Sequence, residues 1–515
     1  MKKTIIDYFE ETVRQYGDKI AVSDKNTTYT YCQLRRTAVL TGCRLKNLRI
    51  KNQPVVVFMN RSTELTAAML GVIYSGNFYT ILDSDSPGQR INSILNTLKP
   101  AAVIYEEEFK ETVHTFPSSI RRIPFNGPAE LNREDEESLL NIQEETSQES
   151  PAYVLFTSGS TGEPKGALLT HQNVISYISW FTEAFNINNE TVFGSQTPLH
   201  FSMSVSDFYG SMFTGAEYHI IPKEYFAFPA KLIPFMNERK INSIYWVPSA
   251  YSIAVKTDLF KYMRPEYLKL ALFAGETMPV KYLNYWKNYL PDLTYANLFG
   301  PTETTDICSF YVVNKEFEEE DSLPIGKPCS NCEHIILDSN GKEAATGVPG
   351  ELYIKGPFVA KGYYNNSQMT EKTFVQNPLH SSYPDTVYRT GDIVKQEPDG
   401  NLLYVGRKDF QIKHMGYRIE PGEIESVFNS SGKVDLSLCI YIKETDELVL
   451  AYEGKENMDE ELRLYGKERL PDYMQPSSFK LYDVFPKNIN GKTDRKAITK
   501  EITEDQKEKE NGKNL

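Results

Sequence analysis

The sequence has few cysteines and no long hydrophobic run. Six cysteines lie scattered among 515 residues, too few for a disulfide scaffold, which fits a reducing compartment. No apolar run approaches the ~20 residues that a membrane-spanning helix needs. Asp7 and Glu10 interrupt the N-terminal segment before it reaches the apolar length of a signal peptide. We therefore expect a cytoplasmic protein that does not act in a membrane.

The chain also lacks an excess of positive charge. Lysine and arginine number 56 against 69 acidic residues, which gives a net charge of -13. This balance argues against nucleic acid or an anionic membrane surface as a partner. Hydrophobic residues make up 40% and aromatic residues 12% of the chain, enough to bury several cores in roughly two to four structural units.

One cysteine pair has a spacing found in metal and redox sites. Cys329 and Cys332 form a C-x-x-C segment close to His334. A zinc site needs about four ligands, and no second pair with suitable spacing is present. We interpret the segment as an ordinary loop rather than a metal or redox site.

Apolar strand patterns alternate with helical patterns over most of the chain. PVVVFM (54–59) and FYTILD (78–83) read as strands, and the segment between them has a serine cap and a glycine stop that predict a helix at 62–76. Further strand patterns begin near residues 101, 152, 241, 268 and 293, several of them separated by helical segments. The sequence therefore predicts an α/β fold with layered parallel or mixed sheets.

The pattern changes after about residue 350. Short β-rich pieces joined by glycine, asparagine and proline turns predict a small β unit at 350–405, and a compact α+β pattern of roughly one hundred residues follows. We expect a large domain at 1–408 and a small domain at 409–503. The almost wholly polar residues 504–515 are expected to form a frayed tail.

A loop rich in glycine and hydroxyl groups lies at 155–166, LFTSGSTGEPKG, between two strand patterns. Its hydroxyls and backbone N–H groups suit an anion with many acceptor oxygens, and phosphate is the obvious candidate. Lys165 adds a positive charge. The P-loop pattern G-x-x-x-x-G-K-[ST] does not fit, because only two residues separate Lys165 from Gly162 and Gly166 follows the lysine.

The loop and five further segments together resemble the adenylate-forming superfamily of acyl-CoA synthetases, luciferases and the adenylation domains of nonribosomal peptide synthetases. The five are LFGPTET (298–304), GELYIKGPFVAKGY (350–363), YRTGD (388–392), GRKDFQIKHMGYRIEPGEIE (406–425) and NGKTDR (490–495), all in the family's order. The last two are closer to amino-acid adenylation domains than to fatty-acid ligases. SVSDFYGSMFTGA (204–216) is similar to D-alanine carrier-protein ligases.

The resemblance implies an ATP-dependent ligase that uses Mg²⁺ and joins an acid to a thiol through an acyl-adenylate. Lys492 matches the lysine that bridges the carboxylate and the α-phosphate, Glu303 the carboxylate associated with Mg²⁺, and Thr302 a donor to the α-phosphate. The implied ATP site comprises Thr157, Ser158, Gly159, Ser160, Thr161, Gly162, Lys165, Asn297, Phe299, Gly300, Asp392, Arg407 and Lys492.

Within this implied site, Asp392 would accept hydrogen bonds from both ribose hydroxyls, and Arg407 would add a ribose or phosphate contact. Phe299 matches the family position at which an aromatic ring stacks on adenine. Asp409 matches the hinge about which the small domain, carrying Lys492, moves between the two half-reactions. Lys413 is a secondary candidate near the path of the thiol, and an exposed strand residue is an equally good interpretation.

The sequence departs from amino-acid adenylation domains at one position. Those domains usually place an aspartate after the aromatic residue of F-D-x-S to hold the α-ammonium of the substrate, and here that position is Ser202. A neutral serine leaves a buried cation without a paired anion. Asp207 and Asp306 are substitutes that would suit an ammonium elsewhere on the substrate, as in a β-amino acid, and an acid without an amine is the alternative. The implied acyl pocket comprises Ser202, Met203, Ser206, Asp207, Tyr245, Leu272, Ala274, Leu298, Asp306 and Ile307.

The thiol acceptor is expected to act in trans, because too few residues follow NGKTDR for a fused carrier domain of roughly eighty residues. The motifs favour the phosphopantetheine of a separate carrier protein, and free coenzyme A is the alternative. A third interpretation is an inactive nucleotide-binding sensor, against which the intact Lys492, Glu303 and Asp392 argue.

Overall fold

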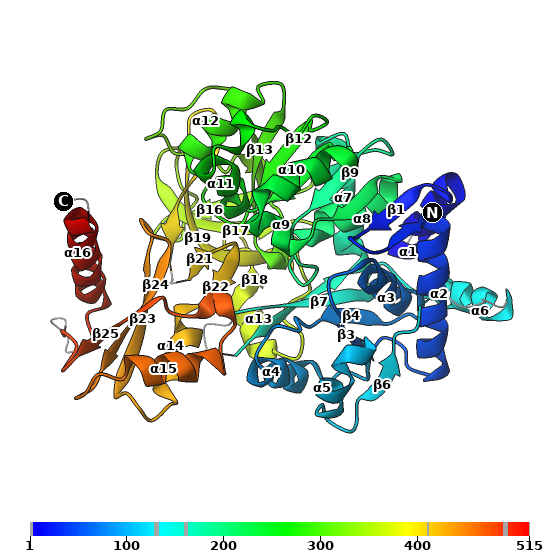
Figure 1. Cartoon of the computed structure of the whole chain (residues 1–515), viewed down its shortest axis with the longest axis horizontal. Coiled ribbons are helices and arrows are strands. Elements are labelled where there is room, and N and C mark those ends of the chain that lie inside the picture. The colour runs from blue at the N-terminus through cyan, green and yellow to red at the C-terminus, as the bar shows by residue number, and fades with distance from the viewer. Residues whose placement is uncertain (1–3, 128–132, 159–162, 409–410, 488–492, 514–515) are drawn as a thin grey trace. The chain divides into compact units, whose positions relative to one another are not determined.

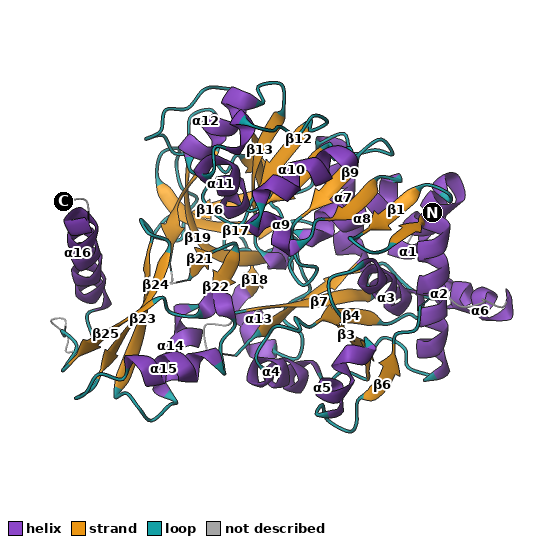
Figure 2. Cartoon of the chain, viewed as in Figure 1, coloured by secondary structure: helices purple, strands orange, loops and turns teal. Residues whose placement is uncertain are grey.

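The computed structural model describes residues 4–127, 133–158, 163–408, 411–487 and 493–513. The chain forms two units, which are described separately. The first comprises residues 1–84, 95–156 and 166–408, and the second comprises residues 85–94, 157–165 and 409–515. Figure 1 follows the chain from one end to the other, and Figure 2 shows that helices accompany the strands of the large sheets. Within the described residues, no helix is long and apolar enough to span a bilayer.

A mixed nine-stranded sheet carries one half of the first unit. Its strand order is β15-β14-β13-β12-β11-β9-β10-β1-β2, with parallel pairing from β13 through β1 and antiparallel pairing at both edges. The strands are β1 (Ile20–Ser23), β2 (Thr28–Thr30), β9 (Val192–Ser195), β10 (Glu217–Ile220), β11 (Ser243–Trp246), β12 (Leu270–Phe273), β13 (Thr294–Phe299), β14 (Ser309–Val312) and β15 (Lys327–Pro328).

A six-stranded sheet with the order β6-β5-β3-β4-β7-β8 carries the other half. Strand β3 is buried at all five positions, as expected for a parallel strand covered on both faces. The predicted helix after it begins at the cap Ser62, whose side chain accepts from the Leu65 N–H, and ends before Gly76. The strands are β3 (Pro54–Phe58), β4 (Phe78–Ile81), β5 (Ala102–Tyr105), β6 (Arg121–Pro124), β7 (Pro151–Thr157) and β8 (Lys165–Thr170).

Helices of the first unit follow the strands in βαβ order, so the predicted α/β class is confirmed. Those nearest the candidate site are α7, which precedes β9, and α8, which follows it. The helices are α1 (Ile5–Tyr16), α2 (Tyr31–Asn47), α3 (Thr63–Tyr74), α5 (Lys110–His114), α6 (Arg133–Glu144), α7 (His171–Ala184), α8 (Ser204–Thr214), α9 (Lys223–Ala227), α10 (Pro229–Glu238), α11 (Pro248–Lys256), α12 (Val280–Tyr289) and α13 (Ser367–Thr373). Most residues of α4 (Gly88–Leu98) belong to the second unit.

A smaller antiparallel sheet completes the first unit. Strands β16, β17, β19 and β18 follow one another in it, and β20 pairs with β19. Its position in the sequence matches the predicted small β unit, although β16 starts earlier than expected. The strands are β16 (Glu333–Leu337), β17 (Pro349–Lys355), β18 (Phe374–Gln376), β19 (Thr386–Gln396) and β20 (Leu402–Arg407).

The second unit is α+β. Its last helix begins at Arg495 and runs to Lys513, so it continues through most of the segment that we expected to be a frayed tail. Ile498 and Ile502 anchor this helix in a core with Ile440. The elements are β21 (Ile412–His414), β22 (Tyr417–Ile419), β23 (Leu436–Ile442), β24 (Glu447–Glu453), β25 (Ser478–Tyr482), α14 (Pro421–Asn429), α15 (Asp459–Lys467) and α16 (Arg495–Lys513).

Candidate active site

A tight turn between β13 and β14 carries two of the predicted site residues, Glu303 and Asp306. The chain leaves β13 at Phe299, makes a 3-10 turn at Thr302–Thr304 and returns so that the Cys308 N–H donates to the Phe299 carbonyl. A Cβ on Gly300 would lie 2.2 Å from the Asp306 carbonyl oxygen, so only glycine fits there.

Thr305, between the two acids, has a φ of 66°, which is unusual for a β-branched residue. Its hydroxyl donates to the Phe358 carbonyl, an interaction that helps to hold the backbone in this conformation. Both carboxyl side chains are buried, with residue exposures of 0% for Glu303 and 2% for Asp306. The turn thus fixes two buried carboxyl groups three residues apart.

Tyr363 holds the Glu303 carboxylate. Its hydroxyl donates to Oε1 at 2.5 Å, and the Ala360 N–H donates to the Glu303 carbonyl at 2.8 Å. The Tyr363 ring is buried and packs edge-on against Phe374. Glu303 therefore has a fixed orientation, as a metal-binding carboxylate requires.

The segment that carries Tyr363 also pairs with the strand that follows the glycine-rich loop. The Leu168 N–H donates to the Gly362 carbonyl at 3.0 Å, and the Tyr364 N–H donates to the Gly166 carbonyl at 2.8 Å. These hydrogen bonds connect the start of β8 to the Glu303 turn through a short stretch of chain.

The structure describes three of the predicted loop residues, Thr157, Ser158 and Lys165. The Thr157 hydroxyl is buried and has no hydrogen-bond partner among the described residues. Within the second unit, the Ser158 hydroxyl donates to the Arg418 carbonyl at 2.7 Å. Lys165 is buried at the start of β8.

Asp392 and Arg407 form an ion pair across β19 and β20. Arg407 Nη1 lies 3.0 Å from Asp392 Oδ1 and donates to the Thr390 carbonyl at 2.8 Å. The two residues are also register partners in the sheet. Gly391, with a φ of 75°, turns the backbone immediately before the aspartate.

Phe299, which we predicted to stack on adenine, lies beside a second aromatic ring. The Phe299 ring centroid is 5.8 Å from that of Tyr404, a residue on β20 that we did not predict from the sequence. Phe299 is buried and Tyr404 is 36% exposed, so Tyr404 offers an open aromatic surface beside it. Predicted Asn297 donates through its amide to the Pro324 carbonyl at 2.7 Å.

Asp306 is the centre of a buried cluster of hydroxyl groups. Its Oδ2 accepts from Ser206 at 3.0 Å and from Tyr177 and Tyr245, each at 3.1 Å. Burial raises the pKa of Asp306 to about 6, while these hydroxyls and that of Ser202 act in the opposite direction because they stabilise the carboxylate. Asp306 is therefore mainly ionised at neutral pH.

Other predicted acyl-pocket residues lie on neighbouring strands or the loop before α8. Tyr245 pairs in register with Leu272, and Leu272 pairs with Ala296. Ligands of parallel sheets commonly bind at the carboxyl ends of the strands, where these residues stand. Met203, Leu272, Ala274, Leu298 and Ile307 are all buried.

Asp207 is a second buried carboxyl group, on α8. Burial raises its pKa well above the usual range, while Ser195 and Arg61 lower it and Asp306 adds to the increase. Neither carboxyl oxygen makes a hydrogen bond of acceptable geometry among the described residues. Arg61, which we did not predict, donates to the carbonyls of Ser195 and Ile221.

Several predicted residues lie elsewhere. Lys492, Asp409 and the loop residues Gly159, Ser160, Thr161 and Gly162 are outside the described part of the chain. Lys413 is on β21, in register with Arg418.

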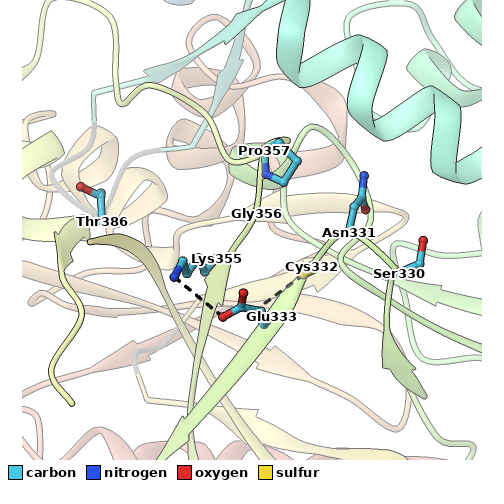
Figure 3. A pocket seen from close by; sticks show the side chains of 8 residues that line it. All are labelled: Ser330, Asn331, Cys332, Glu333, Lys355, Gly356, Pro357 and Thr386. Carbon is cyan, nitrogen blue, oxygen red and sulfur yellow. Dashed lines mark hydrogen bonds and ion pairs between the residues drawn. The ribbon is translucent and has the colours of Figure 1, made fainter. Parts of the chain in front are cut away.

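The C-x-x-C segment forms a turn in which the Cys332 N–H donates to the Cys329 carbonyl, and both thiols are free. Cys332 lines a pocket of about 520 Å³ together with Glu333 and Lys355, which form an ion pair (Figure 3). Among the described residues, no group of histidine, cysteine and acidic side chains is arranged to hold a metal ion.

Comparison with known proteins agrees with the motifs. The sequence matches the family of AMP-binding enzymes over residues 9–364. Gramicidin S synthase 2 of Aneurinibacillus migulanus is 31% identical over 509 residues, which cover 97% of this chain and 11% of that synthase. Gramicidin S synthase 1 of Brevibacillus brevis is 31% identical over 507 residues, which cover 96% of this chain and 44% of that synthase. The chain therefore spans less than half the length of these curated relatives.

Solved structures share the fold. The adenylation domain AlmE of Vibrio cholerae, in complex with glycyl-adenosine-5'-phosphate, has a TM-score of 0.82 and 21% identity, with 98% of each chain covered. PA1221, an NRPS protein with adenylation and PCP domains, has a TM-score of 0.79 and 23% identity, covering 96% of this chain and 84% of that one. The predicted fold class, with a large α/β domain and a small α+β domain, and the predicted family are confirmed: this chain belongs to the AMP-binding, adenylate-forming enzymes.

Proposed function

We propose that this adenylate-forming ligase activates a small amino acid or another small carboxylic acid and passes the acyl group to the phosphopantetheine thiol of a separate carrier protein. The observation that carries the proposal is the turn after β13. It holds one buried carboxylate, Glu303, oriented by Tyr363, and a second, Asp306, inside a cluster of hydroxyl groups. One turn would thus serve the nucleotide on one side and the acid on the other.

In the first step, a carboxylate oxygen of the acid attacks the α-phosphorus of ATP. The bond from that phosphorus to the bridging oxygen breaks, and pyrophosphate leaves. Because both reactants are anions, catalysis requires positioning and neutralisation of charge rather than a strong base. Mg²⁺ bound by Glu303 and the phosphates would supply part of the positive charge, and one protein carboxylate is typical of such sites.

The remaining roles follow the motifs. Lys492 would bridge the two anions, Thr302 would donate to the α-phosphate, and the loop from Thr157 to Lys165 would bind the phosphates. The orphaned Thr157 hydroxyl supports this use of the loop. Asp392 would accept from the ribose hydroxyls while Arg407 holds its orientation, and Phe299 with Tyr404 would contact adenine.

In the second step, the thiol sulfur attacks the acyl carbon, its proton is released, and AMP leaves. We propose that residues 409–503 form a lid that moves about Asp409 between the steps. The division of the chain after Lys408 supports this boundary. The PCP domain in the neighbour PA1221 supports a carrier as the acceptor, and free coenzyme A is tested as the alternative.

Exchange of labelled pyrophosphate into ATP over a panel of small acids tests the first step. We expect exchange that depends on one class of acid. If the protein bound ATP but no acid in the panel supported exchange, the result would contradict the proposal and favour a nucleotide sensor. For the second step, mass spectrometry of the products should show acyl transfer to a phosphopantetheinylated carrier, and acyl-CoA formation at a comparable rate would contradict that acceptor.

Replacing Tyr363 with phenylalanine should weaken metal use. The variant loses the hydrogen bond to Glu303 but keeps the ring against Phe374. Because groups that orient a metal ligand affect metal affinity by about 10- to 100-fold, we expect the Mg²⁺ concentration for half-maximal exchange to rise about tenfold.

The adjacent Tyr364→Phe variant is the matched control, since its ring packs on Phe78 and its hydroxyl has no hydrogen bond among the described residues. Equal Mg²⁺ dependence of the Tyr363→Phe variant and the parent enzyme would show that Tyr363 does not position Glu303.

A further inference from the structure

The buried acyl side of the site contains two acids and one guanidinium. Asp207 and Asp306 are both buried and interact electrostatically, and Arg61 acts on Asp207. A guanidinium remains charged at any relevant pH, so it can neutralise one carboxylate. The second has no cationic partner, and a buried carboxylate without one is costly.

Hydrogen bonds distinguish the two acids. Asp306 accepts from three hydroxyl groups, whereas neither carboxyl oxygen of Asp207 accepts a hydrogen bond of acceptable geometry among the described residues. Hydroxyl donors stabilise the charged form of a carboxyl group, and burial alone favours the neutral form. Within the described residues no ion pair is formed to either acid. Asp306 is therefore the acid held as a carboxylate, and it has no ion-pair partner among these residues.

Orphaned polar atoms beside Asp306 indicate that a polar ligand group belongs there. The Tyr153 hydroxyl is fully buried, interacts electrostatically with Asp306 and has no hydrogen-bond partner among the described residues. Both carboxyl oxygens of Asp207 also lack a hydrogen-bond partner of acceptable geometry among the described residues. An ammonium group offers three N–H donors and one positive charge, which would satisfy these acceptors and balance Asp306.

We propose that Asp306 binds the ammonium group of the substrate, and that the substrate is a small β- or γ-amino acid. This inference rests on the proposed function. Asp306 comes from the turn after β13, whereas the position that would hold an α-ammonium in the resembling domains is the neutral Ser202, before α8.

Pyrophosphate exchange with pairs of acids of equal shape tests the substrate class. The pairs are β-alanine with butyrate and 3-aminobutyrate with 3-methylbutyrate, and glycine and both alanine enantiomers are included. We expect kcat/KM for each β-amino acid to exceed that of its amine-free partner by about 100-fold or more. Amine-free acids or α-amino acids used as well as the β-amino acids would overturn the proposal. If none of the acids supported exchange, that result would instead contradict the proposed function.

The Asp306→Asn variant tests the role of the residue. It removes the charge and keeps the shape, so we expect kcat/KM for the β-amino acid to fall about 100-fold or more, while that for the amine-free partner stays within about threefold. Retained exchange with the amine-free acid also shows that the variant folds. An equal loss of kcat/KM for both acids would overturn the proposal. The matched control is the Asp292→Asn variant, which changes an exposed aspartate.

The pH dependence gives a second readout that needs no variant. Asp306 interacts with Tyr153, Tyr177 and Tyr245, whose raised pKa values keep them neutral. It also interacts with Asp207 and with the Cys329 thiol, and burial raises the pKa values of both. Below its pKa of about 6 the carboxyl group is protonated and loses its attraction for ammonium. The ratio of kcat/KM for the β-amino acid to that for its amine-free partner should therefore fall about tenfold between pH 7 and pH 5. A ratio independent of pH would contradict the ion pair.

Discussion

Replacing Glu303 with glutamine is expected to lower acid-dependent pyrophosphate exchange by about 100-fold or more. The substitution preserves the size of a fully buried side chain and removes its charge. Removal of one preorganised electrostatic contact to a transition state typically costs about 100- to 1000-fold in rate. The loss should appear mainly in kcat. The activity should not recover at the Mg²⁺ concentration that saturates the parent enzyme.

A matched control is Glu316→Gln. Glu316 forms an exposed ion pair with Lys287, and such surface pairs contribute little. We expect exchange within about twofold of the parent for this control. If Glu303→Gln exchanged pyrophosphate as fast as the control variant, Glu303 would have no role in binding the metal or the phosphates.

Replacing Lys492 with alanine is expected to have an effect of similar size, restricted to the first step. An ammonium that bridges two anions lowers their repulsion in the transition state, so its removal should slow adenylate formation by about 100- to 1000-fold. Acyl transfer from a supplied acyl-adenylate to the carrier should remain within about threefold of the parent, because the lid would present other residues in that step.

The two rates are measured separately, by pyrophosphate exchange and by carrier acylation from the synthetic adenylate. Lys487→Ala, an exposed lysine of the same domain that hydrogen-bonds to Thr493, is the control. Equal losses in both steps would show that Lys492 is needed for the structure of the domain rather than for adenylation.

The order of strands and helices was largely predictable because buried parallel strands are continuous apolar runs. Strand β3, buried at every position, and the helix capped by Ser62 illustrate this. The length of α16 was not predictable, because its polar sequence gives no sign that Ile498 and Ile502 dock it on the sheet. Packing against another element outweighs composition in this case.

The site could be predicted as a set of motifs but not as a set of contacts. Tyr363 is the last residue of a recognised segment, yet its hydrogen bond to Glu303 joins residues sixty positions apart. Tyr404 and Arg61 carry no local signal, because each acts on residues that only the folded chain brings close. The choice between Asp207 and Asp306 likewise depends on which carboxyl group accepts hydrogen bonds from hydroxyls of other elements.

The most direct test is a crystal structure with an unreactive mimic of the acyl-adenylate, in which a sulfamate replaces the phosphate and β-alanine is the acyl group. We expect adenine against Phe299 and Tyr404, the ribose hydroxyls on Asp392, the sulfamate beside Thr302 and the amine on Asp306. A nucleoside bound away from these residues would contradict the function proposed for this site. An amine directed away from Asp306 would contradict the role of Asp306.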